Sequence, residues 1–164
     1  MNSNTVNDFL KKIFGKHAFQ ENLRSFLEEL SIFETDATTE SKTTKIIVKE
    51  LKEDFPDEQI VTGRKLAGSF NLKLAIEING QVGLEVKLVK TLIKSPVNVV
   101  KFIGKAVCLQ KKYGTHLYLL LVGAESDAQE PIMIELVEML EDRKMNVFYI
   151  DWETAPAINE NKTE

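Results

Sequence analysis

Glu85 and Lys87 are the residues of this sequence that most need a chemical explanation. They stand two apart in GLEVKL, residues 83–88, within an apolar run that is typical of a buried strand. Charged side chains are rarely buried unless they are paired or used, because they lose their hydration. An acidic residue followed two positions later by Lys occurs five times, and only this occurrence has a strand-like apolar context. Two interpretations follow: a buried ion pair on a sheet face, or a site that uses both charges.

The register of the neighbouring hairpin decides which side chains join this pair. Asn79-Gly80 is a strong hairpin signal between two alternating runs, residues 71–78 and 81–89. A two-residue loop would place each apolar side chain opposite a polar one, because a slip of one residue turns a strand over. We therefore expect a three-residue loop at 78–80, with Gly80 in the left-handed region of backbone space.

This bulged register gathers the polar side chains of both strands on one face. Glu77 is expected to pair with Gln81, Lys73 with Glu85, and Asn71 with Lys87. The leucine, isoleucine and valine side chains then share the other face. The predicted polar cluster contains Asn71, Lys73, Glu77, Glu85 and Lys87.

The elements that would carry these residues follow a simple order. From residue 43 the pattern predicts a helix, three strands, a helix, a strand, a helix and a strand. Ser95-Pro96 is a typical helix start, and Gly114 is a typical stop for that helix. An apolar strand at 115–124, a helix at 131–144 and a strand at 146–152 complete the order.

The N-terminal part has a different pattern. Two helices broken near Gly15 are expected, and the second has one apolar face made by Phe19, Leu23, Phe26, Leu27 and Leu30. The expected organisation is an N-terminal helical element at 1–33, a polar linker at 34–44, a core domain at 45–152 and a disordered tail at 153–164.

Composition narrows the class of protein. The single cysteine, Cys108, excludes an intrachain disulfide framework and a cysteine-rich metal site. The first turn carries asparagines rather than a signal-peptide pattern, and the longest apolar stretch, at 117–124, is too short to span a bilayer. The sequence therefore predicts a cytoplasmic protein with no membrane partner.

The charge distribution points to a polyanionic partner more than the total does. The net charge is −4, yet residues 64–112 contain ten basic and two acidic side chains, so this segment carries +8 and the rest −12. Such asymmetry can produce a local positive field that the total conceals. The alternative is that the lysines are scattered over several solvated faces.

Residues 43–152 resemble the PD-(D/E)XK nucleases, the restriction-endonuclease-like superfamily. The resemblance rests on the element order and on Glu85-x-Lys87 in the third strand of the meander. It implies an α/β fold, a restriction-endonuclease-like α/β/α sandwich with a mixed sheet, here preceded by N-terminal helices.

The resemblance also implies roles for individual residues. Glu85 would hold Mg²⁺, or Mn²⁺, and Lys87 would orient or activate the attacking water, with Glu50 or the weaker candidate Glu53 assisting from the first helix. The family's second metal ligand is an Asp, and this chain has Asn71 there, fourteen residues before Glu85. An amide oxygen can ligate a metal but lacks the negative charge that tightens binding.

Three explanations fit Asn71. The chain is a natural pseudo-nuclease, or another carboxylate such as Glu77 has become the metal ligand, or Asn71 replaces a native Asp by design. The sequence leaves all three open.

The predicted nucleic-acid contacts lie on the helix at 96–113 and on the hairpin. Lys105 occupies the place where many such nucleases have Gln, and Lys101, Lys105 and Lys112 fall within about 40° of one another around the helix. They form either a row of phosphate contacts or an ordinary solvated face. The full predicted set is Lys73, Lys90, Lys101, Lys105 and Lys112.

The resulting expectation is a DNA- or RNA-binding domain of nuclease type whose phosphodiester cleavage is weakened or lost at Asn71. One alternative is an active Mg²⁺-dependent endonuclease. The other is a catalytically inert interaction subunit that forms a homodimer or binds a protein partner through residues 19–31.

Overall fold

The computed structural model describes residues 3–33, 36–68 and 70–153, with side chains from residue 15 onward. The chain divides into two compact units, Met1–Leu30 and Ser31–Glu164. The predicted tail, apart from Glu153, lies outside the described residues. Among the helices of the described part, none is both long and apolar enough to cross a membrane.

The first unit contains one helix, α1 (Ser3–Glu29), and not the two helices that the sequence predicted. The break expected at Gly15 is absent because a single glycine lowers helix stability by only about 1 kcal/mol and, unlike proline, keeps its backbone donor. The predicted apolar face is confirmed in part. Leu23 and Leu27 are fully buried, and Phe19, Phe26 and Leu30 are half-buried.

The second unit is an α/β structure built on a six-stranded mixed sheet with the order β1-β6-β5-β4-β3-β2. β2, β3 and β4 form an antiparallel meander, whereas β4, β5, β6 and β1 run parallel. The strands are β1 (Ile32–Phe33), β2 (Ile60–Lys65), β3 (Lys73–Ile78), β4 (Val82–Leu88), β5 (Leu117–Gly123) and β6 (Asn146–Glu153).

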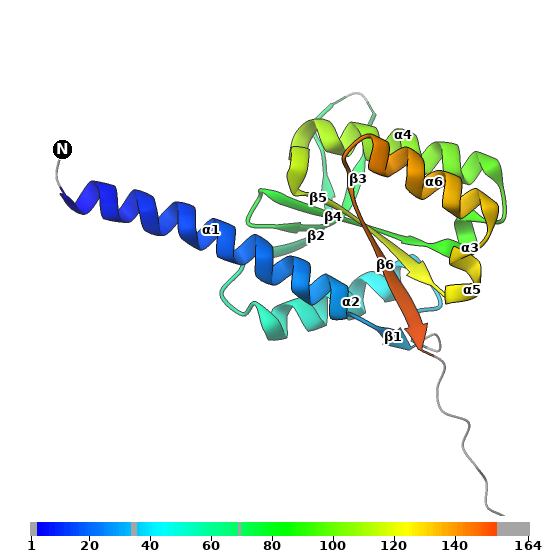
Figure 1. The fold of residues 1–164 in the computed structure, drawn as a ribbon, viewed down its shortest axis with the longest axis horizontal. Coiled ribbons are helices and arrows are strands. Elements are labelled where there is room, and N and C mark those ends of the chain that lie inside the picture. The colour runs from blue at the N-terminus through cyan, green and yellow to red at the C-terminus, as the bar shows by residue number, and fades with distance from the viewer. Residues whose placement is uncertain (1–2, 34–35, 69, 154–164) are drawn as a thin grey trace, which may run out of the picture. The chain divides into compact units, whose positions relative to one another are not determined.

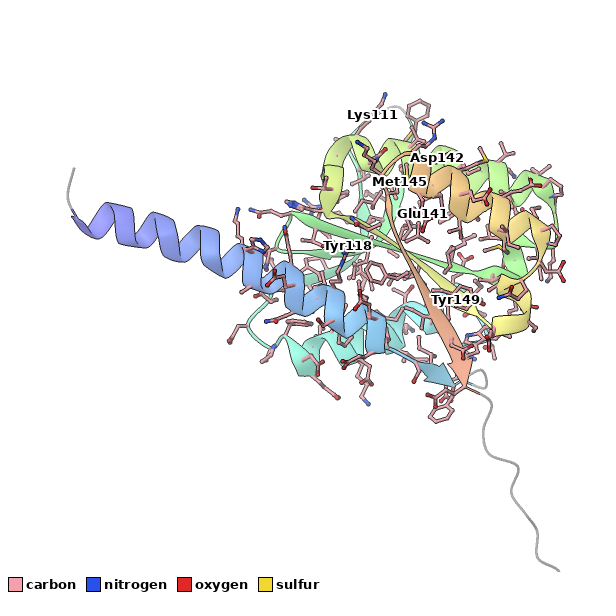
Figure 2. All side chains as sticks on the ribbon, in the orientation of Figure 1. Lys111, Tyr118, Glu141, Asp142, Met145 and Tyr149 are labelled. Atoms are coloured by element: carbon pink, nitrogen blue, oxygen red, sulfur yellow. The ribbon has the colours of Figure 1, made fainter. Side chains whose placement is uncertain are left out.

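Helices lie on both faces of this sheet (Figure 1). α4 (Pro96–Tyr113) and α6 (Pro131–Asp142) pack together against β4, β5 and β6, and α2 (Glu40–Asp54) packs against β3 and β4. The main core lies under α4 and α6, and it contains Phe102 of α4, Leu119 of β5 and Leu136 of α6. Met145, between α6 and β6 (Figure 2), belongs to the same core.

The element order predicted from residue 43 onward, which begins with α2, is confirmed. α4 begins at Pro96 with Ser95 as its N-cap, whose hydroxyl accepts a hydrogen bond from the Val97 backbone at 3.2 Å. α2 begins earlier than expected, at Glu40, because the Thr39 side chain caps it. The sequence did not predict β1, the short helices α3 (Val89–Leu92) and α5 (Glu125–Ala128), or the 3₁₀ turn η1 (Gly114–His116).

The hairpin between β3 and β4 has the predicted faces but not the predicted pairing. Glu77 lies opposite Gly83, so the expected pairing with Gln81 is wrong by two residues. The loop is 79–81, because Asn79 exchanges hydrogen bonds with Gln59 and so leaves the ladder. Gly80 has the predicted positive φ, 66°. Because the shift is even, the polar side chains still share one face.

The predicted pairs of Lys73 with Glu85 and of Asn71 with Lys87 are also wrong. The recorded pairs end at Ile76 with Leu84, and the Ala75 backbone, not Lys73, contacts Glu85. Asn71 is not opposite Lys87, because it precedes β3 and has a φ of 46°, outside the extended region.

Gly83 gives the first testable prediction. A Cβ there would lie 2.9 Å from the Tyr113 ring, whereas a Cβ at Gly104 would meet nothing within 4 Å. We expect Gly83→Ala to lower the free energy of unfolding by about 1–3 kcal/mol, as overpacking does. Gly104→Ala, in the exposed face of α4, should be neutral or stabilise by up to about 1 kcal/mol. Urea unfolding of both variants checks this, and equal effects would contradict the packing described here.

Candidate functional site: a charged cleft

Of the predicted pair, Glu85 lines a cleft of about 360 Å³ between α2, the meander and α4, and Lys87 lines the hollow beside it. This hollow shares Glu40, Glu85 and Lys105 with the cleft, so we treat the two as one charged cleft. It is lined by Glu40, Ser41, Thr44, Lys45, Thr62, Gly63, Lys73, Leu74, Ala75, Glu85, Val86, Lys87, Asn98, Lys101, Phe102 and Lys105.

Glu85 is the most buried charged residue of the cleft, with 5% of its surface exposed. The Lys105 ammonium group, from α4, contacts its Oε1, and the Ala75 backbone donates a hydrogen bond to its Oε2 at 3.2 Å. Burial raises the pKa of the Glu85 carboxyl group, and these contacts offset only part of the rise. Its charged form is therefore costly to keep in place, as is typical of residues held for a function.

Lys87 makes a second ion pair across the cleft. Its Nζ lies 2.7 Å from Oε1 of Glu40, in the first turn of α2. Both side chains are partly exposed, at 23% and 39%. The Glu40 charge is also near enough to Glu85 to contribute to the raised pKa of Glu85, after burial. The charged cleft therefore contains two ion pairs, Glu85 with Lys105 and Glu40 with Lys87.

The sheet and α4 explain why these side chains meet. Glu85 and Lys87 of β4 pair with Leu119 and Leu121 of β5, which face α4. Lys105 lies one turn after Lys101 on α4, so both reach the same side of that helix. The predicted row therefore contributes two of its three lysines to the cleft.

Glu77 lies on the same face but belongs to a separate cluster. Tyr113 donates its hydroxyl hydrogen to Glu77, Lys112 lies 3.2 Å from Oε2, and Arg64 lies 3.5 Å from Oε1. Burial raises the pKa of the Glu77 carboxyl group, but these donors outweigh it, and the pKa ends below the ordinary value. Gly83 opposite Glu77 leaves room for the Tyr113 ring. This carboxylate ties α4 to the meander.

Asn71, the predicted metal ligand, lies in a different hollow. This second hollow, of about 380 Å³, is formed by the segment before β3 and by the end of α4. Asn71 lines it together with Phe70, Cys108 and Lys112. The structure therefore does not bring Asn71 to Glu85.

The remaining predicted residues are also outside the cleft. Lys90 lies over the Trp152 ring at 4.7 Å, and Lys112 lies over the Tyr113 ring at 4.9 Å. Glu50 is in α2 as expected, but ten residues after Glu40, which is about 15 Å along a helix. Glu53 pairs with Lys49 at 3.7 Å.

Glu40 is one of two charged cleft residues, with Lys45, that the sequence did not predict. It was assigned to the linker because the helix was expected to begin later. The signal was present: Thr39 can cap a helix, and an acidic residue in the first turn that follows is favourable there.

The acidic side chains of the charged cleft are those of Glu40 and Glu85. Among the residues whose side chains are described, no three His, Cys, Asp or Glu side chains are grouped to hold a metal ion. Comparison with known proteins adds no assignment, because no family model, curated protein or solved structure matches this chain. Function is therefore inferred from the residues of the charged cleft.

The Glu77 cluster gives the second prediction. We expect Glu77→Gln to lower the free energy of unfolding at pH 7 by about 1.5–3 kcal/mol, as loss of hydrogen bonds to a charged group does. Because the folded-state pKa lies below 4.5, this stabilisation is present above that value and lost as pH falls through the folded-state pKa. Urea unfolding at pH 7 and pH 3 should show a smaller cost in acid, and an equal cost at both would contradict the role of the charge.

Glu85 gives the opposite prediction. Its raised folded-state pKa means that the folded protein holds this proton more tightly, so stability falls as pH rises from 4.5 through the folded-state pKa. Glu85→Gln should therefore leave the unfolding free energy at pH 7 unchanged or higher. The Lys105 side chain, 29% exposed, can be hydrated once its partner is neutral. A cost as large as that of Glu77→Gln, measured in the same urea series, would refute this.

Proposed function

We propose that the chain is a nucleic-acid-binding domain of PD-(D/E)XK nuclease type whose phosphodiester cleavage is weakened or lost. The observation that carries the proposal is the charged cleft. It sets five lysines, Lys45, Lys73, Lys87, Lys101 and Lys105, against two glutamates, Glu40 and Glu85.

The charge of the cleft suits a phosphate backbone. Five lysines against two glutamates give a formal +3 in a protein whose total is −4. A concave surface of one dominant sign concentrates the field and attracts a polyanion in spite of the overall charge. Among the described ion pairs, Glu40 and Glu85 bind Lys87 and Lys105, whereas Lys45, Lys73 and Lys101 bind neither, so these three are the best placed to contact phosphates.

The topology supports the nuclease part of the proposal. The antiparallel meander β2-β3-β4, followed by parallel β5, agrees with the core arrangement that the resemblance implies. Glu85 and Lys87 both lie in β4, and α2 supplies an acidic residue, Glu40, to the same cleft. These features favour nuclease ancestry over an unrelated α/β scaffold.

The register supports weakened cleavage. Metal-dependent phosphodiester cleavage needs carboxylate oxygens that neutralise the phosphate and activate water through the metal. The Ala75 backbone donates a hydrogen bond to Glu85, Lys73 precedes Ala75 by two residues on β3, and Asn71 lines another hollow. β3 therefore contributes no carboxylate to the charged cleft.

Nucleic-acid binding is tested by fluorescence anisotropy with a labelled duplex and a labelled single strand over a range of salt concentrations. Affinity should fall steeply with salt, by a slope of about 0.9 per phosphate contact on duplex DNA. The double variant Lys73→Ala/Lys101→Ala should reduce that slope by about two units. Lys49→Ala/Lys111→Ala, which removes the same charge outside the cleft, is the control and should change it less.

Failure to bind either labelled substrate at low salt would contradict the proposal and favour the interaction subunit. An equal loss in the two double variants would show that binding is diffuse and that the charged cleft is not its centre.

Cleavage is tested separately by plasmid nicking with Mg²⁺, Mn²⁺ and EDTA. We expect no metal-dependent nicking by the wild-type chain. Asn71→Asp should not create it, because Asn71 lies in the second hollow. Metal-dependent nicking that Lys87→Ala removes would instead establish the active endonuclease.

A further inference from the structure

We propose that the ammonium group of Lys105 takes the position of a divalent cation beside Glu85, so that the charged cleft is closed to Mg²⁺ and binds phosphate directly. The part of this inference that concerns phosphate rests on the proposed function. The part that concerns the cation is independent of it.

The hydrogen bonds of Glu85 carry the argument. Its Oε1 is in contact with Lys105, and its Oε2 accepts the backbone hydrogen bond of Ala75. The second carboxylate of the cleft is engaged as well, since Oε1 of Glu40 lies 2.7 Å from Nζ of Lys87. Each carboxylate is therefore already neutralised by an ammonium group, which would repel a cation that approached it.

The chemistry of the lining disfavours that exchange. Mg²⁺ requires oxygen ligands in near-octahedral geometry and usually takes carboxylates, substrate phosphates and water. An ammonium group has three donors and no lone pair, so a lysine cannot be a ligand and only repels the ion. The residues present therefore do not fit the metal that the nuclease resemblance implies.

Lys105 also provides the positive charge that a bound cation would otherwise bring to the phosphate. It comes from α4 beside Lys101, while Lys87 reaches the cleft from β4. The cleft therefore has a positive balance without any ion. Phosphate oxygens can be bound by these ammonium groups through charge-assisted hydrogen bonds.

Titration of the protein alone with Mn²⁺, followed by electron paramagnetic resonance, tests the inference without nucleic acid. The wild-type chain should not bind Mn²⁺ at Glu85, so the Mn²⁺ titration of Glu85→Gln should equal that of the wild type. Lys105→Met retains the apolar stem and removes the ammonium group, so it should bind Mn²⁺ at least tenfold more tightly than the wild type. The double variant Lys105→Met/Glu85→Gln should lose that gain.

Lys111→Met is the control, because Lys111 lies near the C-terminal end of the same helix (Figure 2) and outside the charged cleft. It should bind Mn²⁺ no better than the wild type. Wild-type binding that Glu85→Gln removes would overturn the inference. So would a folded Lys105→Met that gains no affinity.

A second measurement separates this inference from the proposed function. Oligonucleotide binding by the wild type should be equal in EDTA and in Mg²⁺ at matched ionic strength. Binding that requires Mg²⁺ would overturn the inference and leave the proposed function in place. No binding in either condition would reject the proposed function, and the Mn²⁺ titration would still decide whether Lys105 excludes a cation.

Discussion

Strand β4 is the element on which both the fold and the charged cleft depend, because it pairs antiparallel with β3 and parallel with β5. Apolar and charged side chains alternate along β4, so the strand contributes to both faces of the sheet. Leu84, Val86 and Leu88 are buried apolar residues on one face, whereas Glu85 and Lys87 point toward the side covered by α4. A slip of one residue would exchange these faces and bury charges where leucines are needed.

The two buried carboxylates of this sheet face differ in energetic character. Glu77 has three donors and a lowered pKa, so its charge supports the contact between α4 and the meander. Glu85 has a raised pKa in spite of Lys105, so its charge works against stability. Functional sites are among the places where a residue that lowers stability is expected. Of the two, only Glu85 lines the charged cleft.

The α/β class and the order of the elements from α2 onward were predictable because their signals are local. Alternation, the Asn79-Gly80 turn and the Ser95-Pro96 cap each act within a few residues, and all were confirmed in type. The exact register was not predictable, because it depends on Asn79 bonding to Gln59, twenty residues away. The two-residue strand β1 was missed because its pairing with β6 has no local pattern.

The cleft was predictable in part for the same reason. Lys87 and Glu85 share a strand, and Lys101 and Lys105 share a helix face, so periodicity alone groups each pair. What brings the pairs together is the packing of α4 on the sheet, which no local pattern encodes. Glu40 was not predicted because the expected linker extends to residue 44, whereas α2 begins at Glu40.

Amide chemical-shift mapping of the ¹⁵N-labelled protein with a short unlabelled oligonucleotide tests the central claim most directly. The account predicts that the largest shifts fall around the charged cleft, at Thr44, Lys73, Lys87 and Lys101, and that they fade as salt is added. Shifts centred on the second hollow, at Phe70, Asn71 and Cys108, would contradict it, as would a spectrum that the oligonucleotide leaves unchanged at low salt.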